Sequence, residues 1–226
     1  MINQKLLAYF EGYLTEKRKS LFKKVLEDRT RHFTVVLEDI FQPHNASAVV
    51  RTCDIFGIQD VHAIENKYNN KISRHVAKGS QKWLSYNRYR NDGDNTVSCL
   101  ASLKEKGYQI IATTPHNDSC VLQDFDVTKK SAFVFGVEAE GVSDTVIEHA
   151  DGFLKIPMVG FTESLNISVA AAIILQEVTS KLRNSNVDWK LSDEEKEFLY
   201  FDWVKTTIKN VDKIEAHYHQ NARNGN

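Results

Sequence analysis

The chain has 226 residues, a formal net charge of −1 and 42% hydrophobic residues. This length fits one domain with at most a modest extension, and the 10 Gly and 3 Pro argue against collagen-like repeats and long disordered tracts. The near-neutral charge gives no overall sign of a nucleic-acid-binding domain, because such a domain is usually basic.

Helical spacing and short apolar runs predict the elements in chain order. Residues 3–29 repeat leucines and phenylalanines at helical spacing. Five short buried strands are expected after them, at residues 33–37, 60–64, 109–113, 132–135 and 153–156. Helices are expected between and after the strands, at residues 44–55, 95–106, 143–149 and 164–181. This alternation predicts an α/β fold with a mostly parallel sheet and helices on both faces.

The two ends of the chain are predicted to be helical extensions of this α/β core. The expected organisation is an N-terminal extension at 1–30, a core domain at 31–184 and a C-terminal helical extension at 185–226. In open α/β sheets, ligands bind beyond the carboxyl ends of the strands. The loops after residues 37, 113, 135 and 156 therefore mark the edge where a site is expected.

Cysteine usage and the lack of long apolar stretches indicate the compartment. Cys53, Cys99 and Cys120 lie far apart without a Cys-x-x-Cys pair, so neither a disulfide framework nor a zinc site is expected. Residues 1–20 hold no apolar run of signal-peptide length, and residues 167–175 fall far short of the roughly 20 that cross a membrane. We therefore expect a cytoplasmic protein with no structural metal and no membrane association.

Three segments at the predicted ligand edge carry unusual polar residues. In the first, Asn45 lies near a helix start and Arg51 follows six residues later within a largely apolar helix. Asn45 alone can be a helix N-cap and Arg51 a surface residue. In apolar surroundings, however, a guanidinium needs an anionic partner, and an Arg–Asn pair suits a phosphate or a ribose.

The second segment, residues 135–143, holds Gly136, Glu138 and Gly141 between a strand and a helix. Its backbone N–H groups can face a ligand, although a tight turn with a helix cap explains the same residues. The third segment, residues 156–172, combines a glycine-containing loop with Ser164 and Asn166 before an alanine-rich helix. An N-cap at Ser164 leaves Asn166 and the long apolar loop unexplained.

Together these segments resemble the signature motifs of the SpoU/TrmH family of RNA ribose 2′-O-methyltransferases. The matching order is Asn-x5-Arg, then Phe-Gly-x-Glu-x-x-Gly-Val-Ser, then Ile-Pro-Met-x-Gly-x3-Ser-Leu-Asn-x-Ser-Val-Ala. The similarity runs through much of 33–184, which would then be a SPOUT methyltransferase domain. Within the family, the chain looks closest to the branch that methylates guanosine 18 in the D-loop of tRNA.

The resemblance implies a fold, a cofactor and a set of site residues. The fold would be a sheet whose C-terminal part forms a deep trefoil knot, in a homodimer that binds S-adenosyl-L-methionine. The residues implied for the cofactor are Thr113, Gly136, Ile156, Met158, Gly160 and Leu165. The residues implied for catalysis are Arg51, Asn45, Glu138, Ser164 and Asn166. Because arginine has a pKa above about 12, Arg51 acts either as a strongly perturbed base or as an electrostatic orienter of the 2′-hydroxyl.

The charge is unevenly distributed, which points to an RNA-binding surface. Residues 66–91 hold seven basic and no acidic side chains, with Tyr68, Trp83, Tyr86 and Tyr89 among them. Phosphate neutralisation and base stacking are thus both available there. Residues 1–31 add eight basic against four acidic side chains, whereas residues 92–151 hold four against eleven. The residues expected to contact tRNA are Lys17, Arg18, Lys19, Arg74, Lys78, Lys82, Trp83, Arg88 and Arg90.

Three alternatives remain open at the level of sequence. The same chemistry could act on ribosomal RNA or on another position of tRNA. A non-catalytic RNA-binding protein of the same fold is less favoured, because all five implied catalytic residues are present together. A nucleotide-binding α/β protein unrelated to methylation rests on little beyond Gly136 and Gly141.

Overall fold

The computed structural model describes residues 2–69, 71–114, 120–137 and 140–223, and it separates the chain into two compact units. One unit is Thr30–Trp189, and the other combines Met1–Arg29 with Lys190–Asn226.

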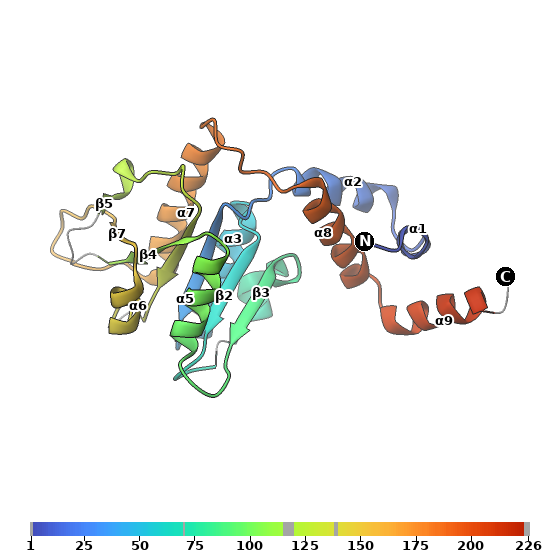
Figure 1. Cartoon of the computed structure of the whole chain (residues 1–226), viewed down its shortest axis with the longest axis horizontal. Helices are drawn as coiled ribbons and strands as arrows, with labels where there is room; N and C mark the ends of the chain where they lie inside the picture. The colour runs from blue at the N-terminus through green and yellow to red at the C-terminus, as the bar shows by residue number, and fades with distance from the viewer. Residues whose placement is uncertain (1, 70, 115–119, 138–139, 224–226) are drawn as a thin grey trace. The chain divides into compact units, whose positions relative to one another are not determined.

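The described part of Thr30–Trp189 contains a sheet of seven strands that all run parallel (Figure 1). The strand order is β3-β2-β1-β6-β4-β7-β5. The strands are β1 (Phe33–Glu38), β2 (Asp60–Ile64), β3 (Ser85–Tyr89), β4 (Gln109–Thr113), β5 (Cys120–Val121), β6 (Ser131–Phe135) and β7 (Gly152–Lys155). The five predicted strands are confirmed with bounds that differ by at most one residue, and the α/β fold class is confirmed with them.

Two strands have no prediction from the sequence, for different reasons. β5 has only two residues, too few to show a pattern. β3 lies at the edge of the sheet beyond β2, where none of its five residues is fully buried. An edge strand of this kind needs no apolar run. The basic stretch at residues 66–91 therefore contains a strand that the sequence pattern does not predict.

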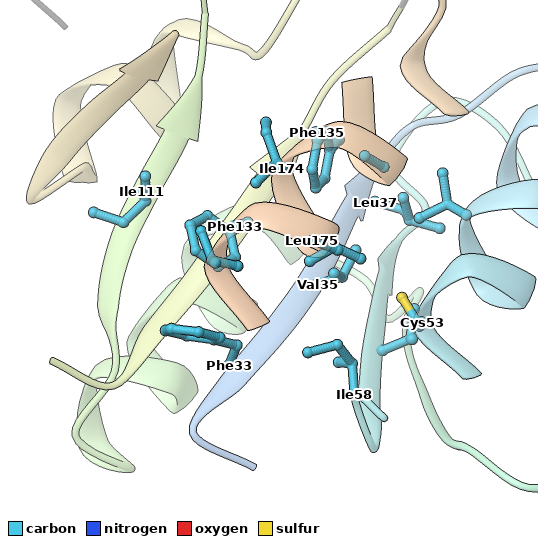
Figure 2. Packing of buried hydrophobic residues seen from close by; sticks show 14 of the residues in the cluster. Phe33, Val35, Leu37, Cys53, Ile58, Ile111, Phe133, Phe135, Ile174 and Leu175 are labelled. Atoms are coloured by element: carbon cyan, nitrogen blue, oxygen red, sulfur yellow. The ribbon is translucent and has the colours of Figure 1, made fainter. Parts of the chain in front are cut away.

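The helices cover both faces of the sheet. The continuous burial of β1 and β6 requires this, because successive strand residues point to opposite faces. On one face, Val35 and Phe133 pack in the same core as α3 (Pro43–Ile55) and α7 (Ile167–Arg183). Figure 2 shows side chains of the strands, including Phe135, near Ile174 and Leu175 of α7. On the other face, neighbouring strand residues pack against α5 (Asn95–Glu105) and α6 (Asp144–His149). The shorter helices are α4 (Arg74–Ala77) and the 3₁₀ turns η1 (Ser80–Lys82) and η2 (Leu122–Asp124).

The other unit is helical and is formed by the two terminal segments of the chain. It contains α1 (Gln4–Glu11), α2 (Glu16–Leu26), α8 (Asp193–Thr207) and α9 (Val211–Arg223). The helical character expected over 3–29 is confirmed, and the segment is divided into two helices. Thr15 caps the second one by accepting a hydrogen bond from the N–H of Arg18. The ring of Trp203 in α8 lies 5.5 Å from that of Phe22 in α2, so the two terminal segments share a core.

Candidate active site at the carboxyl ends of the strands

The site lies where the chain reverses its order in the sheet. β1 and β6 are neighbours, but the chain passes from β1 to β2 on one side and from β6 to β7 on the other. Such a switch point leaves a crevice beyond the carboxyl ends of the two strands, where ligands bind in open α/β sheets. The loops that follow Glu38 and Phe135 border this crevice.

A pocket opens beside it, at the ends of β4, β6 and β7. Its empty space is about 660 Å³, open solvent at the mouth included. The described residues that line it are Thr113, Thr114, Phe135, Gly136, Val137, Gly141, Leu154, Lys155, Ile156, Met158, Ser164, Leu165, Ile167, Ala170 and Ile174. Of the six residues expected to bind the cofactor, five thus share one pocket. Gly160 lies instead in a neighbouring hollow with Thr162 and Glu163.

The loop after β6 is closed on itself by its backbone. Val137 and Gly141 exchange two backbone hydrogen bonds of 2.8 and 2.7 Å. A Cβ atom at Gly136 would lie 1.9 Å from the carbonyl oxygen of Gly141, so no other residue fits there without moving the loop. Glu138, expected to hold the site together, lies outside the described residues.

Glu38 fastens this loop to the end of β1, a role that the sequence analysis does not anticipate. Its side chain is buried, and its carboxylate accepts hydrogen bonds from the N–H and Oγ of Ser143 at 2.9 and 2.7 Å. The Thr96 hydroxyl donates a further bond of 2.9 Å. Ser143 in turn caps α6 by accepting from the N–H of Val146. In the sequence, the only local indication of this role is a glutamate at the end of an apolar strand.

The first and third segments meet at a hydrogen bond between two asparagines. The Asn166 Nδ2 donates to the Asn45 Oδ1 at 3.2 Å. Asn166 is also the N-cap of α7, where its Oδ1 accepts from the N–H of Ser168 at 2.8 Å. The interpretations of Asn45 and Ser164 as N-caps are wrong, because Gln42 and Asn166 occupy those positions. Ser164 is exposed and lines the pocket.

Arg51 lies on α3 with its side chain exposed to solvent. The argument that its apolar surroundings require an anionic partner is therefore wrong, because a hydrated guanidinium has no desolvation cost to offset. The apolar neighbours in its sequence, such as Val49 and Val50, face the core instead. Arg51 is thus available to a ligand that approaches from solvent.

The residues expected to contact RNA fall into three groups. Arg74, Lys78, Lys82 and Arg90 are exposed on the sheet unit, and Trp83 is half-buried there. The Nη2 atom of Arg88 lies 2.6 Å from Oε1 of Glu65, whose side chain is fully buried. The positive charge of Arg88 is therefore already neutralised by this carboxylate. Lys17, Arg18 and Lys19 belong to α2 in the other unit.

Comparison with known proteins assigns the family. The SpoU rRNA methylase family matches residues 32–176. A tRNA (guanosine(18)-2'-O)-methyltransferase of Borreliella burgdorferi is 39% identical over 93% of this chain and 95% of its own length. The enzyme of the same description from Thermus thermophilus is 40% identical over 72% of this chain and 82% of its own. The crystal structure of a TrmH/SpoU tRNA modifying enzyme from A. aeolicus superposes with a TM-score of 0.75 at 34% identity, covering 86% of this chain and 98% of that one.

These matches, with the fold and the pocket, define an α/β protein of the methyltransferase class. The chain belongs to the SpoU methylase family, which confirms the resemblance of its three motifs. Within the described residues, no helix is long and apolar enough to cross a membrane. No group of three or more His, Cys, Asp or Glu side chains in that part of the chain could hold a metal ion.

Proposed function

We propose that this chain is an S-adenosyl-L-methionine-dependent tRNA (guanosine(18)-2′-O)-methyltransferase, which methylates a ribose 2′-hydroxyl in the D-loop of tRNA. The observation that carries the proposal is the Asn45–Asn166 hydrogen bond of 3.2 Å. It joins the first and third motifs beside the pocket that the second motif helps to line. Relatives that carry this activity align over most of the chain, which supports the same reaction here.

The pocket suits S-adenosyl-L-methionine by the chemistry of its lining. Leu165, Ile156 and Ile174 offer apolar surface for an adenine ring, while the loop at Gly136 offers backbone polar groups. The Thr113 hydroxyl already donates to the carbonyl of Val134 at 2.8 Å, so this position offers backbone rather than a free side-chain donor. When bound, the cofactor supplies an electrophilic methyl group on a sulfonium. Gly160 fits this role least well, because it lies outside the pocket.

Arg51 and the two asparagines would handle the RNA. An exposed guanidinium can make paired, charge-assisted hydrogen bonds to a phosphate of the substrate. We assign Arg51 the role of orienting the 2′-hydroxyl and stabilising the charge that develops on its oxygen, because a guanidinium is a poor proton acceptor in general. Asn45, Asn166 and Ser164 would position the ribose, and Glu138 would hold the site together through hydrogen bonds.

The finer points of architecture also belong to this proposal. We assign residues 31–184 as the SPOUT methyltransferase domain, with helical extensions at 1–30 and 185–226. The interleaved order β6-β4-β7-β5 supports a C-terminal trefoil knot. Fully exposed Val159 and Phe161, in the loop between β7 and α7, support burial of this region in a homodimer. Sedimentation velocity tests the dimer, and a concentration-independent monomer would exclude it.

Two further assignments concern partner and location. The exposed cations of residues 66–91, led by Arg74, Lys78 and Lys82, form the proposed tRNA surface, with the basic α2 as a second contact. A cytoplasmic location fits the tRNA substrate and the buried Cys53 and Cys99, which form no disulfide.

The test is methylation of a tRNA transcript with labelled S-adenosyl-L-methionine, followed by mapping of the labelled ribose. We expect label on the 2′-oxygen of guanosine 18 and none on a matched transcript with 2′-deoxyguanosine at that position. Label at another nucleotide, or only in ribosomal RNA, would show that guanosine 18 of tRNA is not the substrate. No label in any RNA would leave a binding protein of the same fold.

A further inference from the structure

Two aromatic side chains stand in solvent near the start of α3. Phe41 is 65% exposed and Tyr68 is 41% exposed, and their ring centroids lie 5.0 Å apart at an interplanar angle of 65°. Edge-to-face contact of this kind stabilises the pair, but both rings still present apolar surface to water. We refer to these two side chains as the Phe41–Tyr68 pair.

The backbone around the pair is fixed by an aspartate in an unfavourable conformation. Asp39 has φ of 50°, in the left-handed region that non-glycine residues rarely adopt. Its carboxylate accepts hydrogen bonds from the N–H groups of Lys67 at 2.7 Å and Tyr68 at 3.4 Å. Ile40, between Asp39 and Phe41, is buried and anchors the loop in the core. The two loops that carry the rings are therefore tied to each other before any ligand arrives.

A second tie connects the far end of the same loop to α3. The N–H of Ser73 donates to the Oγ of Ser47 at 2.7 Å, and that hydroxyl donates to the carbonyl of Pro43. Asn45, which contacts Asn166 in the candidate active site, lies between Pro43 and Ser47 on this first turn of α3. The pair is thus built onto the same helix end that positions a site residue.

The charges around the pair match a polyanion. Lys67, Lys71 and Arg74 lie exposed on the loop that carries Tyr68 or directly after it. The one described ion pair of Lys67, with Glu140 at 3.7 Å, joins two largely exposed side chains and is weak. Ring surface flanked by cations is the combination that single-stranded RNA uses, because a base stacks while the phosphates beside it are neutralised.

The other aromatic residues of the basic stretch do not offer such a surface. Tyr86 packs against the core shared by α3 and α7, and Tyr89 packs against the opposite core. Burial raises the pKa of Tyr86 above its ordinary value, consistent with a phenol held away from water. Trp83 is half-buried. Among the Phe, Tyr and Trp residues of 66–91 that the structure describes, Tyr68 alone is exposed, and its ring partner Phe41 comes from outside the stretch.

We propose that the Phe41–Tyr68 pair is a nucleobase-stacking subsite for an unpaired base of the RNA substrate. This inference rests on the proposed function and adds a specificity element that the three motifs do not contain. Two side chains supply far less area than the roughly 800 Å² per partner of a stable protein interface. A single base, in contrast, is a flat ligand of one or two fused rings, which can stack on one aromatic side chain.

The experiment measures tRNA dissociation constants of aromatic, leucine and alanine variants at fixed salt. Phe41→Ala and Tyr68→Ala should each weaken tRNA binding roughly 5- to 100-fold. Phe41→Leu and Tyr68→Leu keep apolar bulk without a π-face and should lose nearly as much. Phe41→Tyr and Tyr68→Phe keep a ring and should bind as the wild type does. Ile147→Ala, which removes a side chain of similar exposure (38%) from α6, is the matched control.

Three readouts distinguish stacking from other roles. Cofactor affinity should stay unchanged in every variant, since neither residue lines the pocket. The thermal midpoint should fall by no more than a few degrees, the loss expected for one exposed ring contact. Leucine variants that bind tRNA as tightly as the wild type would overturn the proposal. A loss of tRNA affinity that parallels a fall in the thermal midpoint would also overturn it. A change of oligomeric state would do the same, because it would indicate a protein contact. If the wild-type protein methylates no tRNA, the proposed function is refuted. If the leucine variants keep full activity and full tRNA affinity, only the stacking subsite is refuted.

Discussion

The two halves of the ligand edge are built in opposite ways. Beyond β1 and β2, Asp39 and Ser47 accept hydrogen bonds from backbone N–H groups that tie one loop to the next. Glu38 accepts from Ser143 and links this half to the loop after β6. Beyond β4, β6 and β7, the pocket is lined by small or apolar residues and by the backbone of a loop closed at Gly136 and Gly141. The first half holds exposed rings and cations in place, while the second shapes a cavity.

This difference separates the two ligands by size and charge. A backbone-lined cavity selects a small molecule through shape and a few polar groups. A surface of exposed side chains binds a polyanion through many contacts, and the loss of any one contact weakens binding only in part. Substitutions in the first half should therefore change RNA handling and leave cofactor binding intact, and substitutions in the second should do the reverse. The following predictions test that separation.

Arg51→Ala should have the largest effect. We expect turnover to fall about 1,000-fold, because one group that stabilises developing charge contributes on this scale. Cofactor affinity, measured by calorimetry, should stay within about twofold, since Arg51 does not line the pocket. Turnover within about tenfold of the wild type, which corresponds to about 1.4 kcal/mol of barrier, would remove Arg51 from the site.

Gly136→Ala should affect the cofactor half alone. Its Cβ atom would lie 1.9 Å from the carbonyl oxygen of Gly141, so the loop has to open. Overpacking of this kind costs about 1–3 kcal/mol, and we expect cofactor affinity to fall up to about 100-fold. Gly152→Ala is the matched control, because its Cβ atom meets only the end of the Ile111 side chain at 3.3 Å. Equal affinities for the two variants would contradict the closed-loop interpretation.

His62 should make the β1–β3 half sensitive to acid. Burial lowers its pKa from 6.5 to about 4, so the folded chain stays neutral where the unfolded chain binds a proton. Stability should therefore fall as the pH drops from about 6.5 towards 4, by about 2 kcal/mol between pH 8 and pH 5. Urea unfolding across this range should show a smaller loss for His62→Gln. The exposed His75→Gln variant should retain the wild-type profile, and an identical profile for His62→Gln would rule out this cause.

The smallest effect concerns the salt dependence of tRNA binding. Lys78→Glu with Lys82→Glu should lower the slope of log affinity against log salt by about 1.5 to 2. Both side chains are exposed on the basic stretch. Lys129→Glu, an exposed lysine in the acidic segment 92–151, should leave the slope unchanged. A slope that does not move in the double variant would exclude this surface from the interface.

Local patterns predicted the framework because strands and helices are encoded within a few residues. The runs at Phe33 and Ser131 identify β1 and β6, but not that the two strands are neighbours. The role of Glu38 escaped prediction because its partner Ser143 lies 105 residues away. Phe41 escaped for a similar reason, since its ring partner Tyr68 belongs to another loop.

Exposure was the other quantity that the sequence could not supply. Arg51 stands among apolar residues in the chain, yet a helix turns successive side chains in different directions, and its own points into solvent. Conversely, Tyr86 and Arg88 stand in a basic, polar stretch, yet one packs on the core and the other neutralises a buried glutamate. Composition along a segment therefore does not predict which of its individual side chains are exposed.

The Asn45–Asn166 contact also has a consequence for the order of folding. It joins residues 121 positions apart, and the central strands β1 and β6 are themselves paired across nearly 100 residues of chain. Loops of this length must close before such contacts stabilise anything, which slows folding of parallel sheets. The two motifs meet only when almost the whole sheet is assembled. During refolding, methyl transfer should thus return later than helical circular dichroism, as the last property the chain acquires.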